Sequence, residues 1–162
     1  EVVVPGLTDF IIFKIFNRVT DIELYGGSRI KYLACKALMN YVVRRQSAVI
    51  DIVGKSRFRA PTHFETIHRS VHDYLGDGNK MGEGWLLTGE MLELIHSGAP
   101  NIVCTQPFAC LPNHVVGKGV IKELRRRHPE SNIVAIDYDP GASEVNQLNR
   151  IKLMLSTAQK KM

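Results

Sequence analysis

Two short apolar runs, each opened by Asn-Ile-Val, form the clearest pattern in this chain. They follow Asn101 and Asn132, and the basic segment between them has apolar residues at helical spacing. A strand, a helix and a second strand in this order predict a βαβ unit with parallel strands and a right-handed connection. Because open α/β sheets bind ligands outside the carboxyl ends of their strands, we expect the functional site in the loops after these runs.

The N-terminal part of the chain predicts a strand followed by two helices. Val2–Val4 is a third apolar run, and we expect a short buried strand there. Helical spacing over 7–19 predicts the first helix, for which Thr8 is a candidate N-cap. After a pair of glycines, Ser28 is the expected N-cap of the second helix. The apolar stripe of that helix consists of Ile30, Leu33, Ala34, Ala37, Leu38 and Tyr41.

The middle of the chain is less regular. The run 49–53 fits either a helix or a strand, and 61–74 predicts a helix with Pro61 in its first turn. The glycines within 76–84 predict a mobile surface loop. Residues 85–96 predict a helix ended by Gly98, and Ser143 is the expected N-cap of a last helix reaching about Gln159. The core residues expected on helix 85–96 are Leu86, Met91, Leu92 and Ile95.

These elements predict one α/β domain over residues 1–162. If the three apolar runs are neighbouring parallel strands, the loops that follow them share one edge of the sheet. We therefore expect a three-layer fold with a mostly parallel sheet and Rossmann- or flavodoxin-like βαβ units. The sequence opens on an apolar run without Met, so we interpret it as a domain excised from a longer polypeptide. A processed protein that starts with a strand is the alternative.

Composition places the chain among ordinary globular proteins, with 162 residues, 44% hydrophobic and 23% charged. It lacks a run of about 18 apolar residues, so we expect no membrane span. Three cysteines without a signal peptide indicate reduced thiols in the cytoplasm. The net charge of +5 is spread along the chain, and Arg125–His128 is interpreted as a solvated helix end. We therefore expect no nucleic-acid partner.

Cys104 and Cys110 lie at the first of the two strand ends. Pro107 stands between them and Pro112 just after them, and prolines stiffen a loop. A rigid loop with two thiolates suits iron–sulfur or zinc ligation, although this spacing is not a standard zinc pattern. The alternative is a pair of small, buried apolar side chains. Cys35, at the flank of the second helix's apolar stripe, is interpreted as a half-buried structural residue.

Polar residues after the two cysteines add further candidates. His114 is a candidate ligand, proton donor or cap. Gly117-Lys118-Gly119 either holds a phosphate or carboxylate or serves tight helix–strand packing. It is not a Walker A loop, because Pro112 stands where that pattern needs Gly and no Ser or Thr follows Lys118.

Acidic residues and histidines complete the set of candidates. Asp137 and Asp139, at the end of the second run, either bind a cation or a ribose or cap the next turn. His68 and His72 have a spacing compatible with metal binding, but no Glu stands where a metalloprotease motif needs it. No role is assigned to His63.

Residues 82–155 carry several long and unusual motifs. They are Gly-Glu-Gly-Trp-Leu-Leu at 82–87, Cys-Thr-Gln-Pro-Phe-Ala-Cys-Leu-Pro-Asn-His at 104–114, Gly-Lys-Gly at 117–119, Ile-Asp-Tyr-Asp-Pro-Gly at 136–141 and Val-Asn-Gln-Leu-Asn-Arg at 145–150. The chain thereby resembles the 2-hydroxyacyl-CoA dehydratase activase family. More specifically, it resembles the C-terminal, dehydratase-like region of the long CoA-substrate-specific enzyme activases, and residues 1–81 fit this region in outline.

This resemblance implies an oxygen-sensitive iron–sulfur system of anaerobic metabolism. In such a system an ATP-hydrolysing activase with a [4Fe–4S] cluster passes one electron to a dehydratase. The dehydratase carries its own cluster and removes water from a 2-hydroxyacyl-CoA of the 2-hydroxyglutaryl-CoA type. The resemblance places the present chain on the dehydratase-like side. It lacks the phosphate loop of an ATPase, so ATP hydrolysis is not assigned to it. Its implied partners are ATPase activase modules of the same or another chain.

The resemblance also implies which residues bind a cofactor. Cys104 and Cys110 correspond to metal ligands of an iron–sulfur cluster, [4Fe–4S] or larger, and His114 and Lys118 are further cofactor-binding candidates. The remaining ligands would come from a parent polypeptide or a partner, and we expect the chain alone to have no enzyme activity. The alternative is a structural or docking domain without a cofactor.

Overall fold

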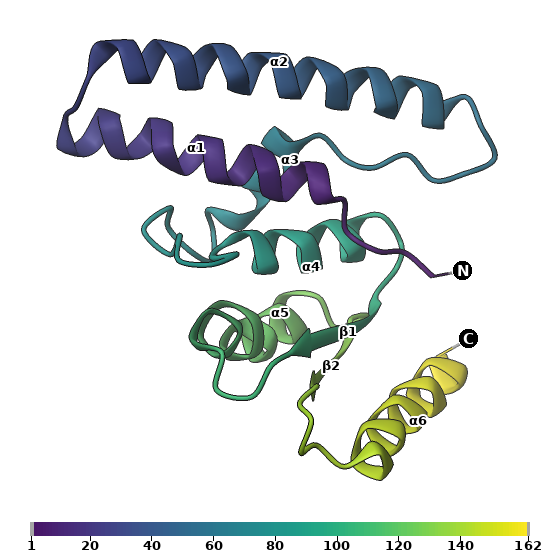
Figure 1. Cartoon of the computed structure of the whole chain (residues 1–162). Coiled ribbons are helices and arrows are strands. Elements are labelled where there is room, and N and C mark those ends of the chain that lie inside the picture. Colours follow the sequence, from purple (N-terminus) through teal and green to yellow (C-terminus); the bar gives the residue numbers. More distant parts are fainter. Residues whose placement is uncertain (1, 162) are drawn as a thin grey trace. The chain divides into compact units, whose positions relative to one another are not determined.

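The structure is a computed structural model that describes residues 2–161 (Figure 1). Contacts divide the chain into two compact units, residues 1–69 and 70–162. Two contact units can belong to one domain, so a single domain over residues 1–162 stays a prediction. None of the described helices is both long and apolar enough to cross a membrane.

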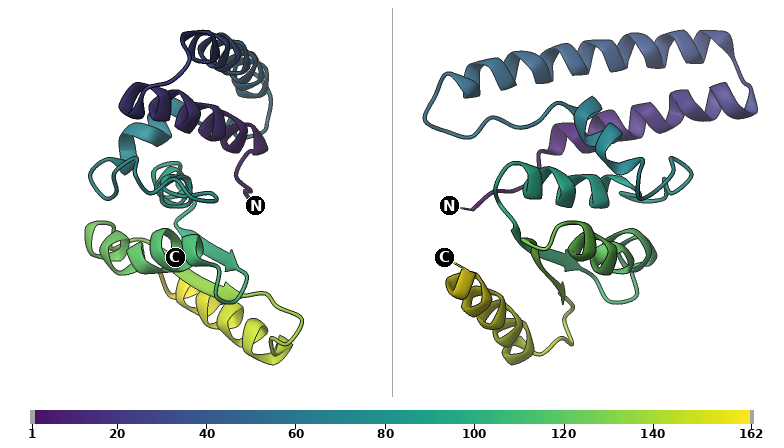
Figure 2. Two further views of the ribbon diagram at one scale, coloured as in Figure 1. Left: turned by 60° about the vertical axis from the view of Figure 1, so that its left-hand side comes forward. Right: turned by 180° about the vertical axis from the view of Figure 1, so that it is seen from behind.

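The first unit is built on two long antiparallel helices, α1 (Leu7–Tyr25) and α2 (Arg29–Gly54), which run side by side in both views of Figure 2. Gly26 and Gly27 separate them with φ angles of 79° and 156°, a region that favours glycine. Ile12, Phe13 and Val19 of α1 are buried. The short α3 (Phe64–Val71) follows a long connection, inside the predicted range 61–74.

Polar residues also hold the first unit together. Gln46 of α2 is buried and donates from Nε2 to the buried Asp9 Oδ1 at 2.6 Å. Its Oε1 accepts the Phe64 amide at 3.3 Å, so one side chain links all three helices. Burial of such groups is tolerated because they are hydrogen-bonded.

Several expectations for the first unit are corrected. Val2–Val4 is not a buried strand: Val2 and Val4 are 90% and 77% exposed, and no described strand pairs with them. A strand needs such pairing to satisfy its backbone groups. Thr8 is not the N-cap of α1, because Gly6 holds that position. Ser28 does occupy the N-cap of α2, although its hydroxyl makes no capping bond, and 49–53 is helical.

The second unit contains the predicted βαβ unit. Strands β1 (Asn101–Gln106) and β2 (Asn132–Asp137) are parallel, in register from Asn101–Asn132 to Gln106–Asp137. The connection runs through a π-helical turn η1 (Asn113–Gly117), a 3₁₀ turn η2 (Lys118–Val120) and α5 (Ile121–Arg127). The buried core of this unit includes Trp85, Leu86, Leu92, Ile102, Leu124, Ile133 and Ile136.

Two further helices flank this sheet. α4 (Leu86–His96) buries the four expected core residues, and Gly98 ends it with a φ of 84°. α6 (Glu144–Lys161) follows β2 and contacts both strands. The mixture of helices and a parallel sheet agrees with the predicted α/β class. The expected third strand is absent from the described residues, whose sheet has two strands.

Candidate ligand-binding site

The carboxyl ends of β1 and β2 lie side by side and are tied together by polar groups. Gln106, only 1% exposed, donates from Nε2 to Asp137 Oδ1 at 2.5 Å. The Tyr138 amide donates to the Gln106 carbonyl at 2.8 Å. These bonds fix the Asp137 carboxylate at the edge of the sheet where an α/β fold binds ligands.

Asp139 connects the two loops that leave the strands. Both of its carboxylate oxygens accept the Phe108 amide, at 2.9 and 2.8 Å. Next to Phe108, Ala109 has a φ of 59°, the one positive φ of a non-glycine residue in the described chain. The loop after β1 is therefore bent sharply and held by a carboxylate from the loop after β2.

A cavity of about 530 Å³ opens beside these loops, a volume typical of small-molecule sites. Gln147 of α6 donates to the Asp137 carbonyl at 2.9 Å, and Arg150 donates to the Ala135 carbonyl at 2.9 Å. α6 is thereby anchored to β2. The polar and aromatic side chains that line the cavity include Phe108, Asp137, Asp139, Ser143, Asn146 and Arg150.

The cavity offers complementary groups for a small polar ligand. The Arg150 guanidinium suits a carboxylate or phosphate, because such pairs form charge-assisted hydrogen bonds. The Asp137 carboxylate can accept a hydrogen bond from a hydroxyl group, and the exposed ring of Phe108 adds an apolar wall. Both sequence candidates line the cavity: Asp137 has one oxygen held by Gln106, and Asp139 also orders the loop through the Phe108 amide.

Cys104 and Cys110 do not line this cavity. Cys104 is 8% exposed on the buried face of β1, where a Cβ added to Gly117 would lie 3.4 Å from its Sγ. Burial raises the pKa of the Cys104 thiol above its ordinary value, and the carboxylates of Glu83 and Glu90 raise it further. Cys110 is half-buried in the loop. The two thiols therefore lie in different environments.

His114 and Lys118 belong to the turns that follow the loop, and they too are outside the cavity lining. Thr88 of α4 donates to the Val116 carbonyl at 2.5 Å and holds the π-helical turn in place. A Cβ on Gly119 would lie 3.0 Å from the His114 carbonyl oxygen, so Gly119 permits this close approach. These contacts favour the packing interpretation of Gly117-Lys118-Gly119 over a phosphate site.

The residues around the two cysteines do not by themselves fit an iron–sulfur cluster. Within residues 2–161, no group of three His, Cys, Asp or Glu side chains close enough to share a metal ion includes Cys104 or Cys110. A cluster usually takes four thiolates. Cys35 is half-buried, as expected, on α2 in the other unit.

The histidine pair whose spacing is compatible with metal binding does come together, because ligand atoms of His68, His72 and Asp77 lie within 4.8 Å of one another. The His68 ring packs against Phe16 and Phe64, with centroids 4.5 and 6.3 Å apart. His72 Nε2 lies 3.8 Å from Asp77 Oδ1. The His63 carbonyl accepts the Thr66 amide at 2.9 Å at the start of α3.

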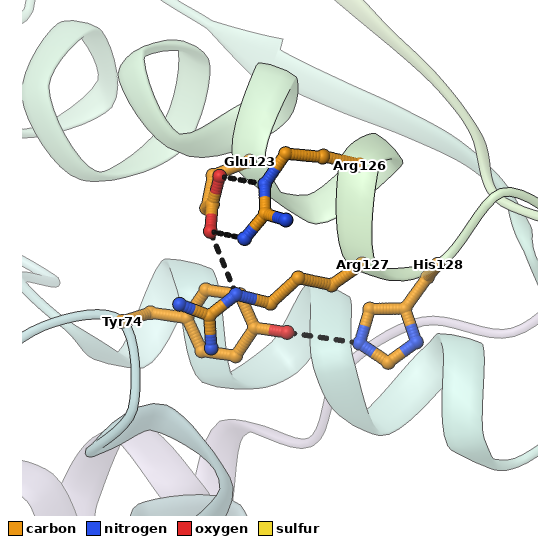
Figure 3. A network of polar contacts seen from close by, with 5 residues as sticks. All are labelled: Tyr74, Glu123, Arg126, Arg127 and His128. Carbon is orange, nitrogen blue, oxygen red and sulfur yellow. Dashed lines mark hydrogen bonds and ion pairs between the residues drawn. The ribbon is translucent and has the colours of Figure 1, made fainter.

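The basic run at the end of α5 is more than a solvated helix end (Figure 3). Glu123 accepts two hydrogen bonds from Arg126, at 2.8 and 2.7 Å, and one from Arg127 at 2.7 Å. The Arg127 guanidinium lies 4.3 Å from the Tyr74 ring centroid, and the Tyr74 hydroxyl is 2.9 Å from His128 Nε2. This network joins α5 to the segment after α3, a contact that the sequence did not reveal.

Comparisons of the chain with protein-family models, with curated proteins and with solved structures found no match. The functional assignment therefore depends on the motifs and on the site geometry described above.

Proposed function

We propose that this chain is a dehydratase-like domain of a cytoplasmic system that activates 2-hydroxyacyl-CoA dehydratases, and that it binds a small polar ligand in the cavity beside β2. The proposal includes a three-layer, Rossmann- or flavodoxin-like arrangement and ATPase activase modules as partners. The chain alone has no enzyme activity in this proposal.

One observation carries this proposal: the motifs behind the resemblance also supply the cavity lining. Segment 104–114 contributes Phe108, segment 136–141 contributes Asp137 and Asp139, and segment 145–150 contributes Asn146 and Arg150. Segments far apart in the sequence thus meet at the carboxyl ends of parallel strands, where α/β domains bind ligands.

The lining favours a ligand that carries both a hydroxyl and a negative charge. In this proposal Arg150 pairs with a carboxylate, and Asp137 accepts a hydrogen bond from the hydroxyl group. A 2-hydroxy acid such as 2-hydroxyglutarate has both groups, and so does its CoA thioester. The domain's role in this proposal is to bind and orient this ligand.

Calorimetric titration with 2-hydroxyglutarate and with 2-hydroxyglutaryl-CoA tests the proposal. We expect saturable binding that Arg150→Ala weakens at least about tenfold, since a charge-assisted pair contributes more than about 1.4 kcal/mol. Arg44→Ala removes an exposed arginine of α2 and is the matched control. Absence of binding to either compound, or equal binding by both variants, would contradict a ligand site at this cavity.

A second proposal keeps the iron–sulfur role of the Cys104–Cys110 loop. It is favoured by the position of Cys110, half-buried in the loop at the carboxyl end of β1. In this case Cys110 and Cys104 contribute two ligands to a cluster that is shared with the activase modules. These modules would supply the other ligands. The cluster would supply one-electron transfer.

Anaerobic reconstitution with iron and sulfide in the presence of the activase modules tests this second proposal. We expect Cys110→Ser and Cys104→Ser to lose iron measured by chemical analysis and EPR, with Cys35→Ser as the control. Unchanged iron content in both loop variants would contradict this second proposal and favour a domain without a cofactor. In such a domain Cys104→Ser lowers the free energy of unfolding by only about 1–2 kcal/mol.

A further inference from the structure

Helix α2 has apolar side chains on two opposite faces, and only one of them is packed. Half-buried residues such as Met39, Val43 and Ile50 alternate with the buried Gln46 on the face toward α1. The opposite face, which we name the outer stripe, is exposed. Its members are Ile30, Leu33, Ala34, Ala37, Leu38, Tyr41, Ala48, Val49 and Ile52.

The outer stripe is too apolar for a solvated helix face. Each of its six larger side chains is at least half exposed. Exposed apolar patches of this kind mark interaction surfaces.

The shape of the outer stripe fits another helix. From Ile30 to Ile52 it extends over about 33 Å, at about 1.5 Å per residue. Ala34, Ala37 and Ala48 interrupt the larger side chains along this stripe, so side chains of a partner helix can pack between them. Helices that lie on membranes bury Trp, Phe and Leu, and this stripe contains Leu33 and Leu38 but no Trp or Phe.

The charged residues around the outer stripe favour a partner with negative charge. Arg29, Lys31, Arg44 and Arg45 are exposed on α2, against one exposed acidic residue, Asp51. Within residues 2–161 none of these four cations has an ion pair, whereas Lys36 pairs with Glu23 at 3.7 Å. Arg45 lies over the Tyr41 ring, 5.1 Å from its centroid, within the stripe itself. A second copy of α2 would bring like charges together, while an acidic helix would neutralise them.

We propose that the outer stripe of α2 is a docking surface for an amphipathic helix of a partner protein whose polar flanks are acidic. This surface lies within the first unit and is independent of the ligand cavity in the second. The ligand-binding proposal and this one can therefore fail separately.

Two synthetic fluorescein-labelled helical peptides with the same Leu and Ala stripe test this proposal. One has Glu on both flanks and the other has Lys, and binding to the full chain is followed by fluorescence anisotropy. We expect the Glu peptide to bind at least about tenfold more tightly than the Lys peptide, and less tightly at high salt.

Charge insertions at exposed positions locate the binding surface. Tyr41→Glu and Ile52→Glu are expected to weaken binding of the Glu peptide at least about tenfold. Leu153→Glu, at an equally exposed apolar position on α6, leaves it unchanged. Circular dichroism verifies that all three variants are folded.

Four results would overturn the proposal. Equal affinity for the two peptides would rule out an acidic partner. Unchanged peptide affinity in both Tyr41→Glu and Ile52→Glu would rule out the outer stripe as the binding surface. Self-association that Tyr41→Glu abolishes, without peptide binding, assigns the stripe to a second copy of the chain. Binding to phosphatidylserine vesicles that Tyr41→Glu abolishes, without peptide binding, assigns it to a membrane.

Discussion

At the scale of single residues, Gly84 shows how tightly a segment that looks mobile in the sequence can be constrained. It has a φ of 51°, and a Cβ at this position would lie 2.2 Å from the Asn79 carbonyl oxygen. The same oxygen accepts the Trp85 amide at 2.6 Å, and the Trp85 side chain is fully buried. The glycines of 76–84 predicted a mobile surface loop from composition alone, and composition carries no information on this contact.

We therefore expect Gly84→Ala to lower the free energy of unfolding by roughly 3 kcal/mol, because the methyl group meets backbone atoms in a strained conformation. Gly76→Ala is the matched control, since nothing lies within 4 Å of the added atom there. It should change stability by less than about 1 kcal/mol. Urea denaturation of both variants measures the difference, and similar losses in the two would contradict the geometry at Gly84.

Cys104 is the residue whose environment depends most on tertiary structure. The sequence placed it at a strand end and left open whether it is a ligand or a buried side chain. The pattern of buried residues along β1 places it on the covered face of the strand, beside Gly117. Cys104 and Cys110 are close in sequence, but their thiols therefore lie in different environments.

At the scale of elements, the sequence predicted α1, α4, α6 and the two parallel strands from helical spacing, short apolar runs and capping residues. Periodicity also identified the apolar stripe of α2, but it did not reveal that this stripe is exposed. The face that packs on α1 contains Tyr32, Lys36 and Gln46 and looks less apolar in the sequence. Polar links such as the bond from Gln46 to Asp9 decide the packing here, and sequence spacing does not reveal them.

The network on α5 gives a prediction for pH. Hydrogen bonds from Arg126 and Arg127 lower the pKa of Glu123 from 4.5 to about 2. A carboxylate with a lowered folded-state pKa stabilises the fold above its ordinary pKa, and this contribution is lost as the pH falls toward the folded-state pKa. Glu123→Gln should therefore melt at a lower temperature than the wild type at pH 7, by a small margin because the pair is exposed. The deficit should fade between about pH 4.5 and 2.

Thermal melting at several pH values measures this effect. Asp51→Asn removes an exposed carboxylate for which the structure gives no ion pair within residues 2–161, and it is the control. A deficit of Glu123→Gln that stays constant down to pH 2, or one equal to that of Asp51→Asn, would contradict the network in Figure 3.

At the scale of the whole molecule, the sequence predicted the edge of the sheet that carries the candidate site but not the cavity. The βαβ pattern placed Asp137 and Asp139 beside the loop of Cys104 and Cys110. The cavity itself needs α6 folded back on β2 by Gln147 and Arg150, and no local pattern encodes that contact. For the same reason the sequence did not reveal that His114 and Lys118 lie outside the cavity lining.

The central claim is that the carboxyl ends of β1 and β2 bind a small ligand. The most direct measurement is an NMR titration of the ¹⁵N-labelled chain with 2-hydroxyglutaryl-CoA. We predict saturable amide shifts concentrated at Gln106–Ala109, Asp137–Ser143 and Asn146–Arg150, with reduced shifts in Arg150→Ala. Shifts that do not saturate, or that fall mainly outside these segments, would contradict the claim.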